Sequence, residues 1–114
     1  MSKRRNQDSL TDIREAIQRI AAYTAGIGFE QFLKDFKTQD AVIRNLEVIG
    51  EATKNLSNRF KKTYPQIPWK DLAGVRDKMI HHYFGINCEI VWMIAKKEIP
   101  GLLSHIEKLL SEET

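Results

Sequence analysis

Residues 39–61, QDAVIRNLEVIGEATKNLSNRFK, carry a long helical pattern. Its expected buried face repeats every three or four residues and comprises Val42, Ile43, Leu46, Ile49, Thr53, Leu56 and Phe60. Polar side chains fall mostly between these positions, as expected for an amphipathic helix with one face on a core. We therefore predict one helix over 39–61, with Thr38 as its N-cap.

The sequence before this helix predicts two more. Ser9 and Asp12 have the spacing of a reciprocal cap at a helix start, and apolar residues then recur at helical spacing as far as Thr24. Residues 29–35 predict a short second helix. Residues 1–8 are polar and are expected to form a solvated tail.

The sequence after residue 61 begins with a connecting loop, because Pro65 and Pro68 lie three residues apart. Pro68 also suits the first position of a new helix. Gly74 either kinks this helix or separates it from a following one. Gly85 is expected to end the helical stretch, since glycine readily adopts the left-handed conformation of a helix terminator.

The C-terminal part predicts one more long helix. Asn87 can cap its start, and Pro100 is expected to kink or restart it. Strand patterns are weak throughout the chain. The predicted fold class is therefore all-α, an up-and-down bundle of four to five helices with short connections.

Composition sets limits on the class of protein. The chain has 114 residues and a net charge of +3, which fits a single domain over 1–114. The single cysteine, Cys88, excludes an intramolecular disulfide. No signal-like segment and no apolar run of membrane-spanning length is found, so we expect a cytoplasmic protein without membrane contact.

Residues 74–85 hold the densest group of chemically capable side chains: Arg76, Asp77, His81, His82 and Tyr83. In a helix, Asp77 and His81 are i, i+4 neighbours, so the carboxylate can orient the imidazole. Arg76 and Tyr83 share a face, whereas Arg76 and His81 lie about 140° apart. If Arg76 and His81 act on one atom, the helix must be distorted or a second chain must complete the site.

An arginine with a histidine, and without a metal-ligand set, favours phosphodiester cleavage in RNA. The RNA 2′-hydroxyl is an internal nucleophile, a histidine can move protons, and an arginine can stabilise charge on the phosphate oxygens. Adjacent His81 and His82 are a poor metal pair, and Cys88 and His105 lack zinc-site spacing. The competing interpretation is a surface ion-pair network without catalytic function.

The pattern from Arg76 through His81 to Tyr83 resembles the R-x-x-x-x-H-x-Y signature of HepT toxins, in the HEPN superfamily of small helical ribonucleases. Residues 38–52, 67–74 and 83–87 are also similar to that family in type and order. The resemblance covers about residues 9–110 and includes the whole motif.

The resemblance implies a homodimeric, metal-independent endoribonuclease without a cofactor, acting as the toxin of a toxin–antitoxin pair, with tRNA as a target class. It implies that Arg76 and His81 form the catalytic pair, and that Asp77 fills the polar position after the arginine. The implied partner is an MntA-type nucleotidyltransferase antitoxin, which silences the toxin by AMPylation of Tyr83. His82 occupies a variable motif position, where it would be an auxiliary proton carrier. The alternative function is a non-catalytic dimeric module that binds a nucleotidyltransferase or nucleic acid.

Overall fold

The computed structural model describes residues 2–81 and 87–113, and within these the side chains of residues 2–4, 76, 78–81 and 113 lie outside the description. Every regular element in the described ranges is helical, which confirms the predicted all-α class. The elements are α1 (Ser2–Thr24), α2 (Phe29–Lys34), α3 (Phe36–Asn55), α4 (Asn58–Thr63), α5 (Trp69–His81), α6 (Cys88–Met93), the π-helix η2 (Ile94–Glu98), the 3₁₀ helix η3 (Pro100–Leu102) and α7 (Leu103–Glu113).

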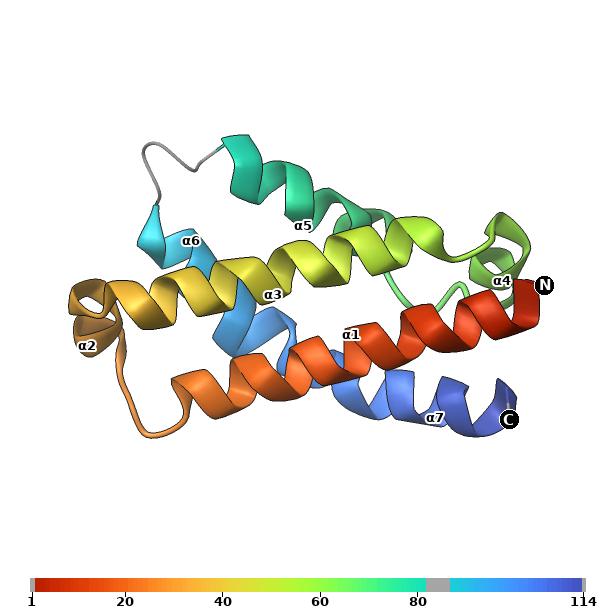
Figure 1. Ribbon diagram of the computed structural model, residues 1–114, viewed down its shortest axis with the longest axis horizontal. Helices are drawn as coiled ribbons and strands as arrows, with labels where there is room; N and C mark the ends of the chain where they lie inside the picture. Colours follow the sequence, from red (N-terminus) through yellow and green to blue (C-terminus); the bar gives the residue numbers. More distant parts are fainter. Residues whose placement is uncertain (1, 82–86, 114) are drawn as a thin grey trace.

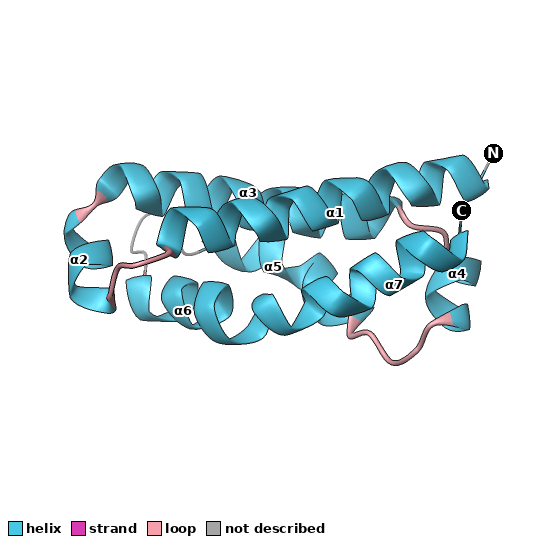
Figure 2. Ribbon diagram, turned by 90° about the horizontal axis from the view of Figure 1, so that it is seen from below, coloured by secondary structure: helices cyan, strands magenta, loops and turns pink. Residues whose placement is uncertain are grey.

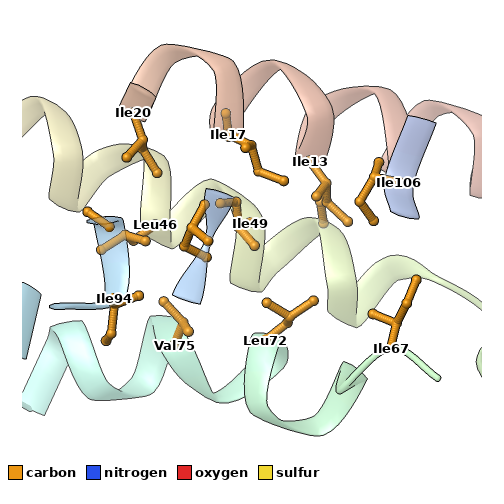
Figure 3. Packing of buried hydrophobic residues seen from close by; sticks show 14 of the residues in the cluster. Ile13, Ile17, Ile20, Leu46, Ile49, Ile67, Leu72, Val75, Ile94 and Ile106 are labelled. Atoms are coloured by element: carbon orange, nitrogen blue, oxygen red, sulfur yellow. The ribbon is translucent and has the colours of Figure 1, made fainter. Parts of the chain in front are cut away.

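The long helices α1 and α3 run antiparallel, side by side, and α5 and α7 pack along them (Figure 1). Seen from below, α6 and α7 form a second layer under α1 and α3 (Figure 2). Their apolar faces meet in one core, in which isoleucines from α1 and α7 face leucine, isoleucine and valine side chains from α3 and α5 (Figure 3). Burial of this shared apolar surface is the main force that holds the bundle together.

The start of α3 differs from the sequence prediction, because Asp35 caps it and Thr38 does not. The Thr38 backbone N–H donates to Asp35 Oδ1 over 3.0 Å, and the Thr38 hydroxyl donates to Oδ2 over 2.6 Å. The Thr38 hydroxyl, followed by its N–H, lowers the pKa of the Asp35 carboxyl. A carboxylate satisfies these free donors and also suits the positive end of the helix dipole.

The predicted single helix over 39–61 is wrong at its end, since α3 stops at Asn55 and α4 follows after a break. Ser57 caps α4 by accepting from the Phe60 N–H over 3.1 Å, which stabilises such a helix by about 1 kcal/mol. Asn6 of α1 also accepts from the Ser57 N–H over 3.1 Å. These two bonds satisfy the backbone at the break, so the chain can turn there.

The same contact explains why α1 begins at Ser2, so that the predicted tail over 1–8 and the predicted start at Ser9 are wrong. Asn6 and Ser9 are both buried in α1, at 5% exposure each. Asn6 is held by Ser57, which lies 51 residues away in sequence. Helical structure in this polar segment is therefore fixed by tertiary contacts, and the local cap signal at Ser9 is overridden.

Three other predicted boundaries, at Thr24, Asn87 and Pro100, agree with the structure. Helix α1 ends at Thr24, and Gly26 (φ 75°) makes the left-handed turn that leads to α2. Asn87 caps α6 by accepting from the Glu89 N–H over 3.0 Å. The π-helix η2 and the 3₁₀ helix η3 interrupt the last helix around Pro100, because proline lacks an N–H and its ring crowds the preceding turn. No helix within the described residues is both long enough and apolar enough to cross a membrane.

Candidate functional site on helix α5

Helix α5 carries three of the positions predicted to be functional, those of Arg76, Asp77 and His81. It follows the loop around Pro65 and Pro68, and its first turn is closed by the Leu72 N–H, which donates to the Pro68 carbonyl over 3.1 Å. The helix then continues through Gly74 to His81. A methyl group added at Gly74 would meet no atom within 4 Å, so no close contact requires a glycine at this position. The predicted alternative that Gly74 separates two helices is therefore wrong.

The rest of the bundle holds α5 through the buried face of this helix. Leu72 and Val75 are 4% and 6% exposed and point toward Ile49 of α3 (Figure 3). Trp69 is buried at the helix start, and its indole N–H donates to the Tyr64 carbonyl over 2.9 Å. Trp69 therefore serves in packing, whereas Asp77 further along the same helix is open to solvent.

The positions of Arg76, Asp77 and His81 all lie on α5, whereas His82, Tyr83 and the predicted terminator Gly85 lie outside the described residues. The side chains of Arg76 and His81 are also outside the description. Because α5 is a regular helix at these positions, positions 76 and 81 lie about 140° apart around its axis. The helix distortion that the sequence left open is therefore not seen in the backbone of Trp69–His81.

Asp77 has a partner that the sequence did not suggest. Its carboxylate lies 3.4 Å from the Lys54 ammonium of α3. Both side chains are open to solvent, at 58% and 39% exposure, so a pair of this kind contributes at most about 1 kcal/mol to stability. Its consequence is electrostatic, because a lysine lies against the carboxylate that was expected to orient His81. Lys54 precedes Asp77 by 23 residues, so no helical spacing could have indicated the contact.

The other candidate ligands do not come together. Cys88 is half-buried and packs against the core, and His105 is exposed on α7. Among the residues that the structure describes, no group of three or more His, Cys, Asp or Glu side chains is placed to hold a metal ion.

The fold is an all-α bundle in which helix α5 carries the motif positions 76 and 81. Sequence comparison identifies the family. Residues 13–109 match the family described as Ribonuclease HepT-like. The chain belongs to this HepT-like ribonuclease family, as the motif of α5 predicted. Similarity therefore extends over the frame as well as the motif.

Two relatives illustrate the similarity. "Probable ribonuclease HepT" of Thermococcus cleftensis is 52% identical over 107 residues, which cover 94% of this chain and 97% of the relative. "Putative RNase MJ0127" of Methanocaldococcus jannaschii is 50% identical over 112 residues, which cover 98% of this chain and 93% of the relative. No solved structure matches the chain significantly.

Proposed function

We propose that this protein is a metal-independent endoribonuclease that acts as the toxin of a toxin–antitoxin pair, with tRNA as its target class. The observation that carries the proposal is the match of residues 13–109 to HepT-like ribonucleases, together with the positions of Arg76 and His81 on a single helix, α5. Neither part would suffice alone, because fold does not fix function and a short motif recurs by chance.

The proposed reaction uses the 2′-hydroxyl of RNA as nucleophile. His81 removes its proton, the 2′-oxygen forms a bond to phosphorus, and the bond from phosphorus to the 5′-oxygen breaks. A protonated imidazole returns a proton to that leaving oxygen. Arg76 binds the non-bridging oxygens, whose charge grows in the transition state. The products are a 2′,3′-cyclic phosphate and a free 5′-hydroxyl.

We further propose that the working site is formed by two copies of the chain. Positions 76 and 81 lie about 140° apart on α5, so one regular helix does not direct both toward one phosphate. In a two-fold dimer, the same surface of both chains forms the interface. If this surface includes α5, Arg76 of one chain can lie near His81 of the other. Asp77 acts as a positioning residue for His81, in competition with its contact to Lys54, which is 3.4 Å away.

The proposed regulation acts on Tyr83, with an MntA-type nucleotidyltransferase as the partner that attaches AMP. Tyr83 follows Arg76 by seven residues, and AMP groups there would add negative charge and bulk beside the arginine's part of the motif. They would compete with RNA phosphate for Arg76. His82 would serve as an auxiliary proton carrier next to His81.

The first test is cleavage of total RNA and purified tRNA by the isolated protein with excess EDTA. We expect cleavage to continue, with 2′,3′-cyclic phosphate ends, because the proposed nucleophile needs no metal-bound water. Complete loss of cleavage in EDTA that Mg²⁺ restores would contradict metal independence. Absence of cleavage under all conditions, with retained binding to the nucleotidyltransferase, would instead favour the non-catalytic dimeric module.

The second test concerns Tyr83 and uses intact-mass spectrometry after incubation with the nucleotidyltransferase and ATP. We expect mass increments of AMP and a parallel loss of cleavage. Tyr83→Phe should remain unmodified and active in the presence of the partner, while Tyr23→Phe, on the exposed end of α1, should be modified as the wild type is. AMP increments that persist in Tyr83→Phe would exclude this tyrosine as the sole acceptor.

A further inference from the structure

Basic residues are concentrated in one segment of the chain, which lies at one end of the bundle (Figure 1). From residue 52 to residue 70 the chain has five Lys or Arg residues and no Asp or Glu, although the whole chain has 18 basic and 15 acidic residues. This segment comprises the end of α3, all of α4, the proline loop and the start of α5 (Figure 1). The rest of the chain is therefore slightly acidic. The contact of Asn6 with Ser57 also holds the first turns of α1, with exposed Arg5, at this end.

A groove at this end gathers three of the lysines. It has a volume of about 600 Å³ and lies between α4 and the start of α5. Lys61 and Lys62 line it from α4, and Lys70 lines it from α5. None of the described residues that line it is acidic. Asp71, the next residue after Lys70, lines a different cavity together with Glu98.

The two helices that carry the lysines are fixed relative to each other. The Phe60 ring lies 4.9 Å from the Tyr64 ring and 5.9 Å from the Trp69 ring, measured between centroids. The Trp69 indole N–H is already bonded to the Tyr64 carbonyl, and the side chain is 7% exposed. The three aromatic residues thus set the spacing of the lysine backbones, and the rings of Phe60 and Trp69, at 5% and 7% exposure, are largely closed to a base. Recognition here depends on charge.

The groove is in line with the positions of Asp77 and His81 on α5. Lys70, Asp77 and the position of His81 are separated by seven and four residues, so they lie within about 40° of one another around α5. At 1.5 Å per residue, position 81 is about 16 Å along the axis from Lys70. Asp77 lies between these two positions on α5, and the Lys54 ammonium lies 3.4 Å from its carboxylate. A polyanion that enters at the groove can therefore follow α5 without meeting an unpaired carboxylate at Asp77.

We propose that the groove formed by Lys61, Lys62 and Lys70 binds the phosphate backbone of single-stranded RNA and directs the strand along α5 toward His81. This inference rests on the proposed ribonuclease function and assigns it a substrate-binding surface away from the cleavage motif. Contacts to phosphate carry affinity without base specificity, so the groove accepts different sequences.

The test measures binding of a labelled single-stranded RNA oligonucleotide by fluorescence anisotropy, over a series of salt concentrations. All proteins are full-length and carry His81→Ala, so that RNA is not cleaved. The test variant adds Lys61→Ala, Lys62→Ala and Lys70→Ala. One control makes arginine substitutions at the same three positions, and another makes Lys34→Ala and Lys37→Ala at the opposite end of the bundle. Circular dichroism verifies that each variant is folded.

We expect the triple alanine variant to bind at least about tenfold more weakly, and its slope of log affinity against log salt to fall by about 2, at about 0.7 per lost phosphate contact. The arginine variant and the Lys34/Lys37 variant should keep the affinity and slope of the parent. Equal affinity and slope in the triple alanine variant and the Lys34/Lys37 variant would overturn the assignment. Polyglutamate that competes as strongly as unlabelled RNA would also overturn it, in favour of an acidic protein partner.

The groove and the ribonuclease proposal can fail separately. Cleavage by the wild-type protein, combined with unchanged binding in the triple alanine variant, would refute the groove and leave the ribonuclease standing. RNA binding that depends on the three lysines, without cleavage by the wild-type protein, would support the groove and refute the ribonuclease.

Discussion

His81→Ala is expected to lower the rate of RNA cleavage by about 10²- to 10⁴-fold, which is the contribution of a positioned general acid or base. Arg76→Ala should lower it by about 10²- to 10³-fold, as expected for loss of a group that stabilises transition-state charge. Helical content should not change in either variant, because both positions lie within α5 and alanine is a strong helix former. The measurement is single-turnover cleavage of tRNA, with circular dichroism as the folding check.

Matched controls distinguish this result from a general effect of removing a charge or a ring. His105→Ala removes an exposed histidine from α7, and Arg19→Ala removes an exposed arginine from α1. Both controls should cleave RNA as the wild type does. Full activity in either His81→Ala or Arg76→Ala would remove that residue from the catalytic pair.

Much of the fold could be predicted from the sequence, because apolar residues at helical spacing indicate the helices of this bundle. The face that begins with Val42 and Ile43 is buried in α3 as expected. The positions of Asn87 and Pro100 also correctly predicted a helix start and a helix interruption. Each of these signals is local, since it depends on residues within about two turns of one another.

The errors arose where distant residues decide the local structure. Helix α1 extends back to Ser2 because Asn6 is buried against Ser57, and α3 ends at Asn55 because the same contact supports the break. Asp35 displaced Thr38 as the cap because an ionised carboxylate accepts two bonds from Thr38 at once. A pattern of helical spacing contains no information about partners 51 residues apart.

For the candidate site, the sequence supplied the residues and their order on one helix, and the family match supports their assignment to ribonuclease chemistry. It did not indicate the contact between Lys54 and Asp77, nor the meeting of α4 lysines with Lys70 in one groove. Both depend on how α3, α4 and α5 pack together. Spacing along a single helix nevertheless gave the angle between positions 76 and 81, which leads to the central claim that two chains form one site.

Mixing two inactive variants tests that claim most directly. Arg76→Ala and His81→Ala chains are co-expressed with different tags, and the mixed dimers are purified with both tags. If each site takes Arg76 from one chain and His81 from the other, one of the two sites in a mixed dimer is intact, and its activity should recover to about half of the wild-type dimer. A chain with both substitutions, paired with a wild-type chain, should then be inactive because each of its sites lacks one residue.

If each chain instead carries a complete site, both results reverse. The dimer of Arg76→Ala with His81→Ala would stay inactive, and the dimer of a wild-type chain with the doubly substituted chain would keep about half of the activity. Recovery in the first dimer together with inactivity in the second is the result predicted by the shared site. The reversed pair of results in purified mixed dimers would contradict it.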